Sequence, residues 1–544
     1  MLCYRPSMLI GVLASLPIGS ADPASLAPSL GPKLVPGPYA VGFKSLWQLD
    51  YSRVYNTVFD DKTTYASGKA PRPILINIWY PAERSSDSRP MLHRDYLSIQ
   101  TEDPRLARFA SKLAEYEREI VSDEVMGKPI GKLNDDERRR LDGLWSAPTA
   151  CVRDAPPLDA RFPLVIYHSG ARSSFEDNAV FCEFLASHGY VVVGSAFQSV
   201  TGETLAADGR DGSARDLDFL IAHARRQSNV DWQHIGLVGH SLGAQAILMF
   251  RAQAASPVDA VASLDTTQDY HTLASPGWKE MTKRLLENSR YVNGPLLMVA
   301  NAKALFQLAD SLDRAERYYF TLKDQDHNDF IDQGIKRRAL ENEAKPGDPK
   351  LRSELERAQA GYESVCTFVL DFFDVYLKNQ IGRREELVKR FRDTKFGGDQ
   401  PHVEHLPVGA TGPEPYRDEL NVPPAVRQIR FITAARGVDA MLALLMRWRE
   451  KEPEALVLQE DCGFALVDEC LGQGRIDDAI AINRFYSAHD ATFSKIFLRT
   501  GDGCRRAGML SFAEDYYKKA CLLDPSDALA AARLKELKER MRTP

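Results

Sequence analysis

The fold of this chain is decided by one stretch, His234-Ile-Gly-Leu-Val-Gly-His-Ser241-Leu-Gly-Ala-Gln-Ala-Ile-Leu-Met-Phe250. Its pattern predicts a short apolar strand, a sharp turn around Ser241 and an apolar helix. Gly239 and Gly243, two residues before and two after the serine, let the strand and the helix approach each other without a Cβ clash. Such a turn is called a nucleophile elbow, because it raises a strained serine above the edge of a sheet, where a substrate can reach the hydroxyl group.

The length and composition favour a multidomain globular protein. At 544 residues the chain is too long for one ordinary core, and 44% hydrophobic residues are enough for each of two or three domains to bury one. The formal net charge is -6, and acidic and basic residues are interspersed, so nothing in the sequence favours a nucleic-acid partner. The eight cysteines show neither a Cys-x-x-Cys pair nor metal-ligand spacing, and no metal or organic cofactor is expected.

The N-terminus has the pattern of a secretory signal. A start that includes Arg5 is followed by an uncharged apolar run, 8–18, and by small residues that allow cleavage after Ala21. The run is too short to span a membrane, and no transmembrane segment is expected. Residues 1–21 are therefore predicted to be a signal peptide of a secreted or periplasmic protein. If this segment is not a signal, the protein is cytoplasmic.

Strands that alternate with helices dominate the segment 22–396. Apolar runs predict strands at 39–43, 74–80, 163–167, 190–193, 235–238, 260–264, 294–300 and 318–322. Alternation with helices favours βαβ units and a mostly parallel sheet flanked by helices. We therefore predict an α/β protein with an α/β-hydrolase fold. The carboxyl ends of its strands should share the edge that bears the chemistry.

An insertion and a linker interrupt this pattern. Residues 91–160 show charged amphipathic patterns that indicate helices at 106–121 and 134–144, so this segment is predicted to be a helical insertion that forms a lid or a wall over the site. Residues 397–424 contain six prolines and little periodic apolar content. This composition predicts a Pro-rich linker between domains.

The C-terminal segment, 425–544, repeats itself. Gly474 and Gly508 are 34 residues apart, and so are Ala479 and Ala513. A period of 34 residues made of paired helices resembles the tetratricopeptide repeat. The sequence therefore predicts a C-terminal all-α repeat domain, which could bind a protein partner or pack on the preceding domain.

Ser241 needs a base to take its proton, because a serine hydroxyl is a poor nucleophile at neutral pH. In a hydrolase of this type the chain order is nucleophile, acid, histidine. His327 follows the last predicted strand in a polar loop and is the predicted base. The other histidines fit less well: no strand end positions His271, His240 must diverge from the neighbouring serine, and His168 precedes the nucleophile.

The acid that orients the base is predicted to be Asp265, which directly follows the strand 260–264. Asp310 and Asp326 remain alternatives, although Asp310 lies well beyond the end of the strand 294–300. The tetrahedral intermediate also needs backbone N–H donors for its oxyanion. The expected donors are Leu242, directly after the nucleophile, and Ala171, in a loop after the strand 163–167.

A family resemblance rests on these motifs and on several others. They are Gly37-Pro-Tyr-Ala-Val-Gly-Phe43, Ile78-Trp-Tyr-Pro81, Tyr167-His-Ser-Gly170, Leu185-Ala-Ser-His-Gly-Tyr190, Gly239-His-Ser-Leu-Gly243, Leu264-Asp265 and His327-x-x-Phe330. Together they resemble platelet-activating-factor acetylhydrolase-type and related dienelactone-hydrolase-like α/β-hydrolases over 37–377. The resemblance implies that Ser241, Asp265 and His327 form the family triad, with Leu242 and Ala171 as oxyanion donors. The insertion and the repeat domain depart from the family. Position 241 also lacks the cysteine that some related hydrolases use.

The expected activity is that of a serine hydrolase that cleaves carboxylic esters through an acyl-enzyme on Ser241. Its substrates would be small-molecule or lipid esters, of the short-chain acyl or phospholipid type. An amidase or peptidase would use the same triad, since the two reactions differ in how the leaving group is handled. The alternative from another class is a catalytically inactive hydrolase-fold scaffold that acts through its helical repeats.

Overall fold

A computed structural model describes residues 33–54, 71–84, 88–104, 106–197, 205–253, 256–271, 273, 278–393, 402–408, 437–451, 458, 460–472, 474–506 and 510–542. The predicted signal peptide, 1–21, lies outside the described residues, and so does most of the predicted linker. None of the described helices is both long and apolar enough to cross a membrane.

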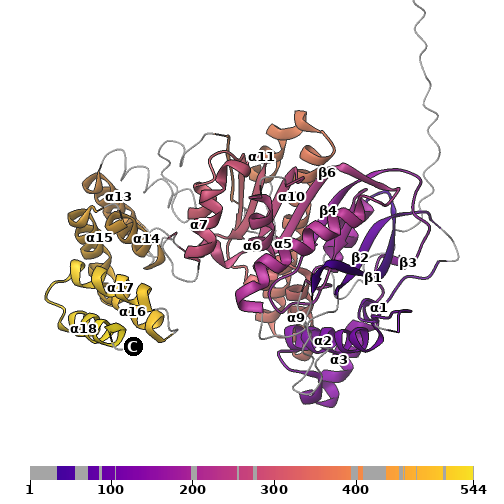
Figure 1. The fold of residues 1–544 in the computed structure, drawn as a ribbon, viewed down its shortest axis with the longest axis horizontal. Helices are drawn as coiled ribbons and strands as arrows, with labels where there is room; N and C mark the ends of the chain where they lie inside the picture. Colours follow the sequence, from indigo (N-terminus) through magenta and orange to yellow (C-terminus); the bar gives the residue numbers. More distant parts are fainter. Residues whose placement is uncertain are drawn as a thin grey trace, which may run out of the picture.

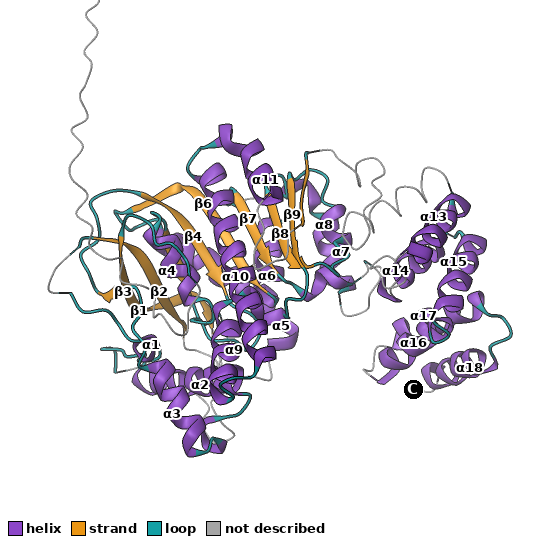
Figure 2. Ribbon diagram, turned by 180° about the vertical axis from the view of Figure 1, so that it is seen from behind, coloured by secondary structure: helices purple, strands orange, loops and turns teal. Residues whose placement is uncertain are grey.

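A ten-stranded sheet forms the centre of the larger part of the molecule (Figure 2). Its strands are β1 (Ala40–Val54), β2 (Pro71–Ala82), β3 (Cys151–Arg153), β4 (Phe162–His168), β5 (Val191–Gly194), β6 (Val230–His240), β7 (Ala260–Leu264), β8 (Leu296–Asn301), β9 (Arg317–Leu322) and β10 (His402–Leu406). In space the order is β10-β9-β8-β7-β6-β4-β5-β2-β1-β3. The strands from β4 to β9 run parallel, whereas β2 and β10 are antiparallel to their neighbours. The prediction of a mostly parallel α/β sheet is confirmed.

Helices cover both faces of this sheet, as the alternation of apolar side chains along the strands requires. In β4, Val165 and Tyr167 belong to one core and Leu164 and Ile166 to the other. The first core packs under α4 (Ala179–Ser187), α9 (Asp332–Ala344) and α10 (Pro349–Leu377). The second core packs under α5 (Leu205–Ala224), α6 (Leu242–Arg251), α7 (Lys279–Glu287) and α8 (Gln307–Asp310). Figure 1 looks onto α5 and α6, and Figure 2 onto α10.

The segment 91–160 is largely helical, with α1 (His93–Tyr96), α2 (Ala107–Met126) and α3 (Asp135–Trp145). It also contains β3, which pairs with β1 and which the helical prediction missed. Val121 and Val125 of α2 share a small apolar cluster with Leu340 of α9, and both figures show α2 beside α9. This packing favours a fixed wall over a detached lid.

The predicted linker, 397–424, is wrong in its first part. His402–Leu406 forms β10, which pairs antiparallel with β9 and buries Val403 and Leu406 against the sheet. The side chain of His405 also lies 2.6 Å from the carboxylate of Glu316. Pairing with β9 and the contact with Glu316 hold 402–406 at the edge of the sheet, although the prolines around this segment indicate a linker. The α/β domain therefore extends at least to Leu406.

The C-terminal region is helical, as predicted, with α13 (Val438–Lys451), α14 (Glu460–Gly472), α15 (Ile476–His489), α16 (Ile496–Arg506), α17 (Leu510–Leu523) and α18 (Ala528–Arg542). The helix α11 (Arg384–Asp393) lies in sequence between α10 and β10, and short 3₁₀ helices occur at Ile130–Lys132, Thr267–Tyr270, Ser289–Tyr291, His327–Phe330, Ile381–Arg383 and Phe493–Lys495. The C-terminal helices share an apolar core, which includes the buried Cys470 and Cys504 and also Leu305, from the segment after β8.

Candidate active site

The parallel strands end in register at one edge of the sheet. His168, the last residue of β4, pairs with Gly239 of β6, and His240 pairs with Leu264, the last residue of β7. On β8 and β9, Asn301 pairs with Leu322. The segments that follow these strands are therefore neighbours in space, although they come from distant parts of the sequence.

Ser241 lies between β6 and α6 in a conformation that few residues adopt. Its φ of 53° and ψ of -116° mark a strained backbone, and its N–H donates to the carbonyl of Leu264 at 3.1 Å. A Cβ added to Gly239 would lie 2.5 Å from the carbonyl carbon of Gly243, and one added to Gly243 would lie 2.2 Å from the carbonyl oxygen of His168. Both glycines are therefore required by close backbone approach, as the elbow pattern predicts.

Asp265 and His327 contact each other at the same edge. The Nδ1 atom of His327 lies 2.6 Å from Oδ2 of Asp265, across 62 positions of sequence. The Asp265 side chain is 3% exposed, and that of His327 is 39% exposed. A buried carboxylate thus orients a histidine whose ring remains accessible, which is the relation that a general base and its acid require.

Two further groups hold the Asp265 carboxylate. Its Oδ1 atom accepts hydrogen bonds from the hydroxyl of Tyr270 and, at 3.2 Å, from the backbone N–H of Asn301. Burial, followed by the charge of Asp265, raises the pKa of Tyr270, which keeps its phenol protonated as a donor. The remaining carboxylate oxygen, Oδ2, is the one in contact with His327. No sequence pattern signals Tyr270, because its role depends on the turn that follows β7.

His240 connects the elbow to His327. Its Nε2 atom lies 3.0 Å from the carbonyl oxygen of His327, and the two ring centroids are 4.6 Å apart. Burial, followed by the charge of His327, lowers the pKa of His240 to about 3, so this ring is neutral above that pH and can donate from Nε2. The residue directly before Ser241 therefore packs on His327.

The expected oxyanion loop lies against the elbow. A Cβ added to Gly170 would be 3.5 Å from the Cβ of Ser241 and 3.2 Å from Nδ1 of His240. Ala171, the next residue, is exposed. Leu242 is the first residue of α6, a position whose N–H has no acceptor within the helix. Leu242 thus follows the serine directly, and Ala171 follows the glycine that packs against it.

The alternative acids make other contacts. Asp310 accepts a hydrogen bond from the hydroxyl of Tyr319 at 2.7 Å. Asp326 is 68% exposed and bonds to Arg338 at 2.6 Å. Of the three candidate acids, Asp265 is the one that contacts His327.

The alternative histidines are also engaged elsewhere. His168 stacks on Phe197 with ring centroids 3.7 Å apart, and its Nδ1 lies 2.8 Å from the carbonyl of Ser169. Burial lowers its pKa to about 4. The ring of His271 packs near Trp278, with centroids 5.6 Å apart. The histidine in contact with Asp265 is His327.

Buried carboxyl groups lie beneath the oxyanion loop. Asp177 accepts hydrogen bonds from the hydroxyl of Tyr167 at 2.6 Å and from the N–H of Gly170 at 3.4 Å. Glu117, on α2, accepts from the N–H of Phe175 at 3.3 Å. Burial raises the pKa of Glu117 to about 8 and that of Asp177 to about 7.

The raised pKa values of Glu117 and Asp177 allow a prediction of how the free energy of unfolding depends on pH. We expect the free energy of unfolding to fall as the pH rises from 6.5 to 8, because the folded protein retains protons on Glu117 and Asp177 that the unfolded chain has already lost. Each group contributes a slope of at most about 1.4 kcal/mol per pH unit. The buried histidines His168 and His240 act in the opposite direction, but this contribution fades as the pH rises above their unfolded pKa of 6.5.

Urea unfolding at several pH values between 6.5 and 8 measures this slope. Glu117→Gln should flatten it, because the substituted side chain cannot titrate. A free energy of unfolding that rises across this window in the wild-type protein would contradict the assignment.

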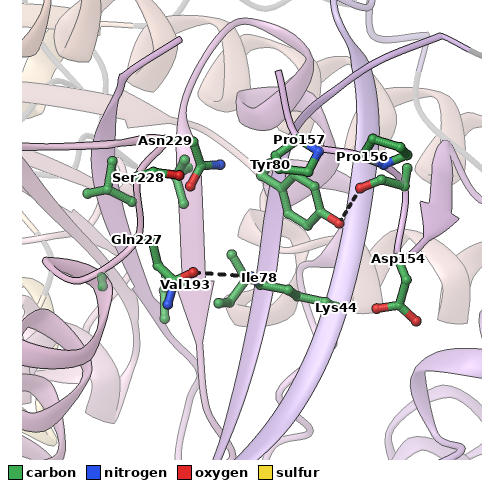
Figure 3. Close-up of a pocket in the computed structure, with 14 residues that line it drawn as sticks. Lys44, Ile78, Tyr80, Asp154, Pro156, Pro157, Val193, Gln227, Ser228 and Asn229 are labelled. Carbon is green, nitrogen blue, oxygen red and sulfur yellow. Dashed lines mark hydrogen bonds between the residues drawn. The ribbon is translucent and has the colours of Figure 1, made fainter. Parts of the chain in front are cut away.

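A separate cavity of about 250 Å³ opens at the opposite end of the sheet, near the start of β6 (Figure 3). Two of its polar side chains are already satisfied: Lys44 donates to Gln227 at 3.2 Å, and the hydroxyl of Tyr80 donates to the carbonyl of Ala155 at 2.7 Å. The described part of the chain contains no group of His, Cys, Asp or Glu side chains suited to hold a metal ion.

Comparisons with known proteins add little to this geometry. No protein-family model matches the chain, and no curated protein matches its sequence. Among solved structures, the chain is similar to a ferulic acid esterase from Streptomyces cinnamoneus, with 20% sequence identity and a TM-score of 0.42. That match covers 63% of this chain and 91% of the esterase.

Proposed function

We propose that this protein is a serine hydrolase of the α/β-hydrolase fold that cleaves carboxylic esters through an acyl-enzyme on Ser241. One observation supports it most: the 2.6 Å contact between His327 and the buried Asp265, at the sheet edge where the strained Ser241 lies. The passage from β6 through the turn into α6 is the structural context that a Gly-x-Ser-x-Gly elbow requires.

The proposed mechanism assigns one task to each group. Ser241 Oγ attacks the ester carbonyl while His327 takes its proton, and Asp265 stabilises the imidazolium that forms. The N–H groups of Leu242 and Ala171 donate to the oxyanion of the tetrahedral intermediate. The intermediate collapses with loss of the alcohol, which takes the proton from His327. Water, activated by the same histidine, then hydrolyses the acyl-enzyme and releases the acid.

The scaffold alternative is less well supported, because an inactive domain has no need to keep Asp265 and His327 in contact at the serine edge. A fluorophosphonate probe tests this directly, since it reacts with an activated serine and not with an ordinary one. We expect wild-type protein to be labelled and Ser241→Ala to remain unlabelled. Ser195→Ala is the matched control, because Ser195 follows β5 at the same edge of the sheet and should leave labelling intact. Labelling that survives in Ser241→Ala would contradict the assignment.

The substrate class of the proposed hydrolase can be tested with two series of compounds. Esters of increasing acyl length, from acetyl to long-chain phospholipid type, distinguish a short-chain esterase from a lipase-like enzyme. The corresponding anilides distinguish an esterase from an amidase. We expect turnover of the short-chain esters, because the wall formed by α2 is anchored on α9 and limits how far the site can open.

We further propose that the C-terminal helices are tetratricopeptide-like repeats that bind a protein partner. Two helix pairs support this. In α14, a Cβ added to Gly463 would lie 2.6 Å from the ring of Tyr486 on α15, and in α16 one added to Gly501 would lie 2.6 Å from the ring of Tyr517 on α17. The pair α14 and α15 and the pair α16 and α17 thus pack through the same kind of contact, a glycine against a tyrosine ring. Export of the protein is proposed from the sequence of 1–21 alone.

A further inference from the structure

We propose that Glu124, on α2, is a positioning residue for the oxyanion loop, 169–174, and acts on Ala171 through Ser173. This inference rests on the proposed function, in which the N–H of Ala171 binds the oxyanion. It assigns the insertion 91–160 a task in the reaction, beyond enclosing the site.

The contacts of Glu124 connect the loop to two helices. Its Oε1 atom accepts a hydrogen bond from Oγ of Ser173 at 2.7 Å, and its Oε2 atom accepts one from the side-chain amide of Gln333 on α9. The backbone of Gln333 in turn donates to the carbonyl of Asp177 at 3.1 Å. Ser173 is buried and also contacts the carboxyl group of Asp177. Glu124 therefore joins the loop, α2 and α9 in one network.

The loop needs such support because its backbone is strained. Arg172, between Ala171 and Ser173, has a φ of 57°, a left-handed conformation that a residue with a long side chain rarely adopts. A strained residue persists only when the surrounding structure holds it in place. Gly170 is held by Asp177 at 3.4 Å, and Ser173 is held by Glu124 at 2.7 Å. Without the second contact, the N–H of Ala171 can turn away from the oxyanion.

The α2 helix is itself well anchored for this task. Glu117, two turns before Glu124 on the same helix, is buried and accepts from the N–H of Phe175, just past the loop. Val121 and Val125 pack against Leu340 of α9. The two carboxyl groups thus reach the loop from a helix whose position is set by apolar packing.

Steady-state kinetics of Glu124→Ala on a short-chain ester tests the proposal. We expect kcat to fall by about 10-fold to 100-fold with KM within about twofold, because a displaced oxyanion donor weakens binding of the transition state more than binding of the substrate. Glu124→Gln should recover most of the activity, since its amide oxygen can still accept from Ser173. Glu115→Ala is the matched control, because Glu115 lies on the exposed side of the same helix.

A double-mutant cycle distinguishes positioning from general loss of structure. Ser173→Ala and Glu124→Ala should each lower kcat, and the double variant should lose less than the product of the two losses, because both changes remove the hydrogen bond between Ser173 and Glu124. Independent, multiplicative losses would overturn the proposal, and so would a kcat within twofold of wild type in either single variant.

Fluorophosphonate labelling distinguishes a failure of the proposed serine hydrolase function from a failure of the proposed role of Glu124. A wild-type protein that is neither labelled nor active overturns the proposed function together with this inference. A labelled wild type whose Glu124→Ala and Ser173→Ala variants hydrolyse normally overturns this inference alone.

Discussion

Replacing Ser241 by alanine is expected to lower ester turnover by on the order of 10⁶, because no acyl-enzyme can form without the hydroxyl. The backbone at this position has a φ of 53°, which alanine tolerates no better than serine, so the strain of the elbow stays the same. The fold should therefore persist while the chemistry is lost. Spectrophotometric hydrolysis of a short-chain ester, measured with both proteins at equal concentration, gives the ratio of kcat/KM.

The control for this variant is its thermal unfolding. A melting temperature within a few degrees of wild type shows that the loss is chemical. Ser195→Ala should keep nearly full turnover, since that side chain is a buried serine outside the proposed triad. Turnover of Ser241→Ala within tenfold of wild type would exclude Ser241 as the nucleophile and leave the scaffold hypothesis as the better one.

The parts of the fold that follow from local pattern were predictable from the sequence. The strands from β4 to β9 contain apolar runs between turn residues, and each overlaps its predicted position, although β6 begins at Val230 and not at 235. Ser241 and Asp265 come directly after β6 and β7, His327 lies in the loop that follows β9, and topology brings such strand ends to one edge. The contact between Asp265 and His327 is therefore a consequence of chain order that sequence reasoning can reach.

The rest depends on tertiary contacts that leave no local pattern. β10 is a five-residue edge strand whose partner, β9, is about 80 residues away, and the prolines around it indicate a linker. Tyr270 acts on Asp265 only because the chain turns back after β7. Glu117 and Glu124 occur in a charged amphipathic helix, where carboxyl groups are usually solvated. Glu117 is buried and Glu124 half-buried because α2 packs on α9, which the periodicity of either helix alone does not specify.

Asp265→Asn is expected to lower kcat by on the order of 10⁴ near neutral pH. The carboxylate now accepts from Nδ1 of His327, which leaves Nε2 free to take the serine proton. In the variant, the amide oxygen would accept the hydrogen bonds from Tyr270 and from the N–H of Asn301 that Oδ1 of Asp265 accepts in the wild type. The NH₂ group of the amide would then face Nδ1 of His327. The histidine would then carry its proton on Nε2, the wrong atom for a base.

The two alternative acids serve as matched controls for this prediction. Asp310→Asn and Asp326→Asn should each retain kcat within about tenfold of wild type, because their carboxylates are engaged by Tyr319 and by Arg338 rather than by His327. Fluorophosphonate labelling of Asp265→Asn should be slowed and not abolished, since Ser241 remains present but lacks an effective base. If Asp310→Asn or Asp326→Asn were the variant with the large loss, while Asp265→Asn stayed active, the acid of the triad would have to be reassigned. The 2.6 Å contact between Asp265 and His327 would then serve stability alone.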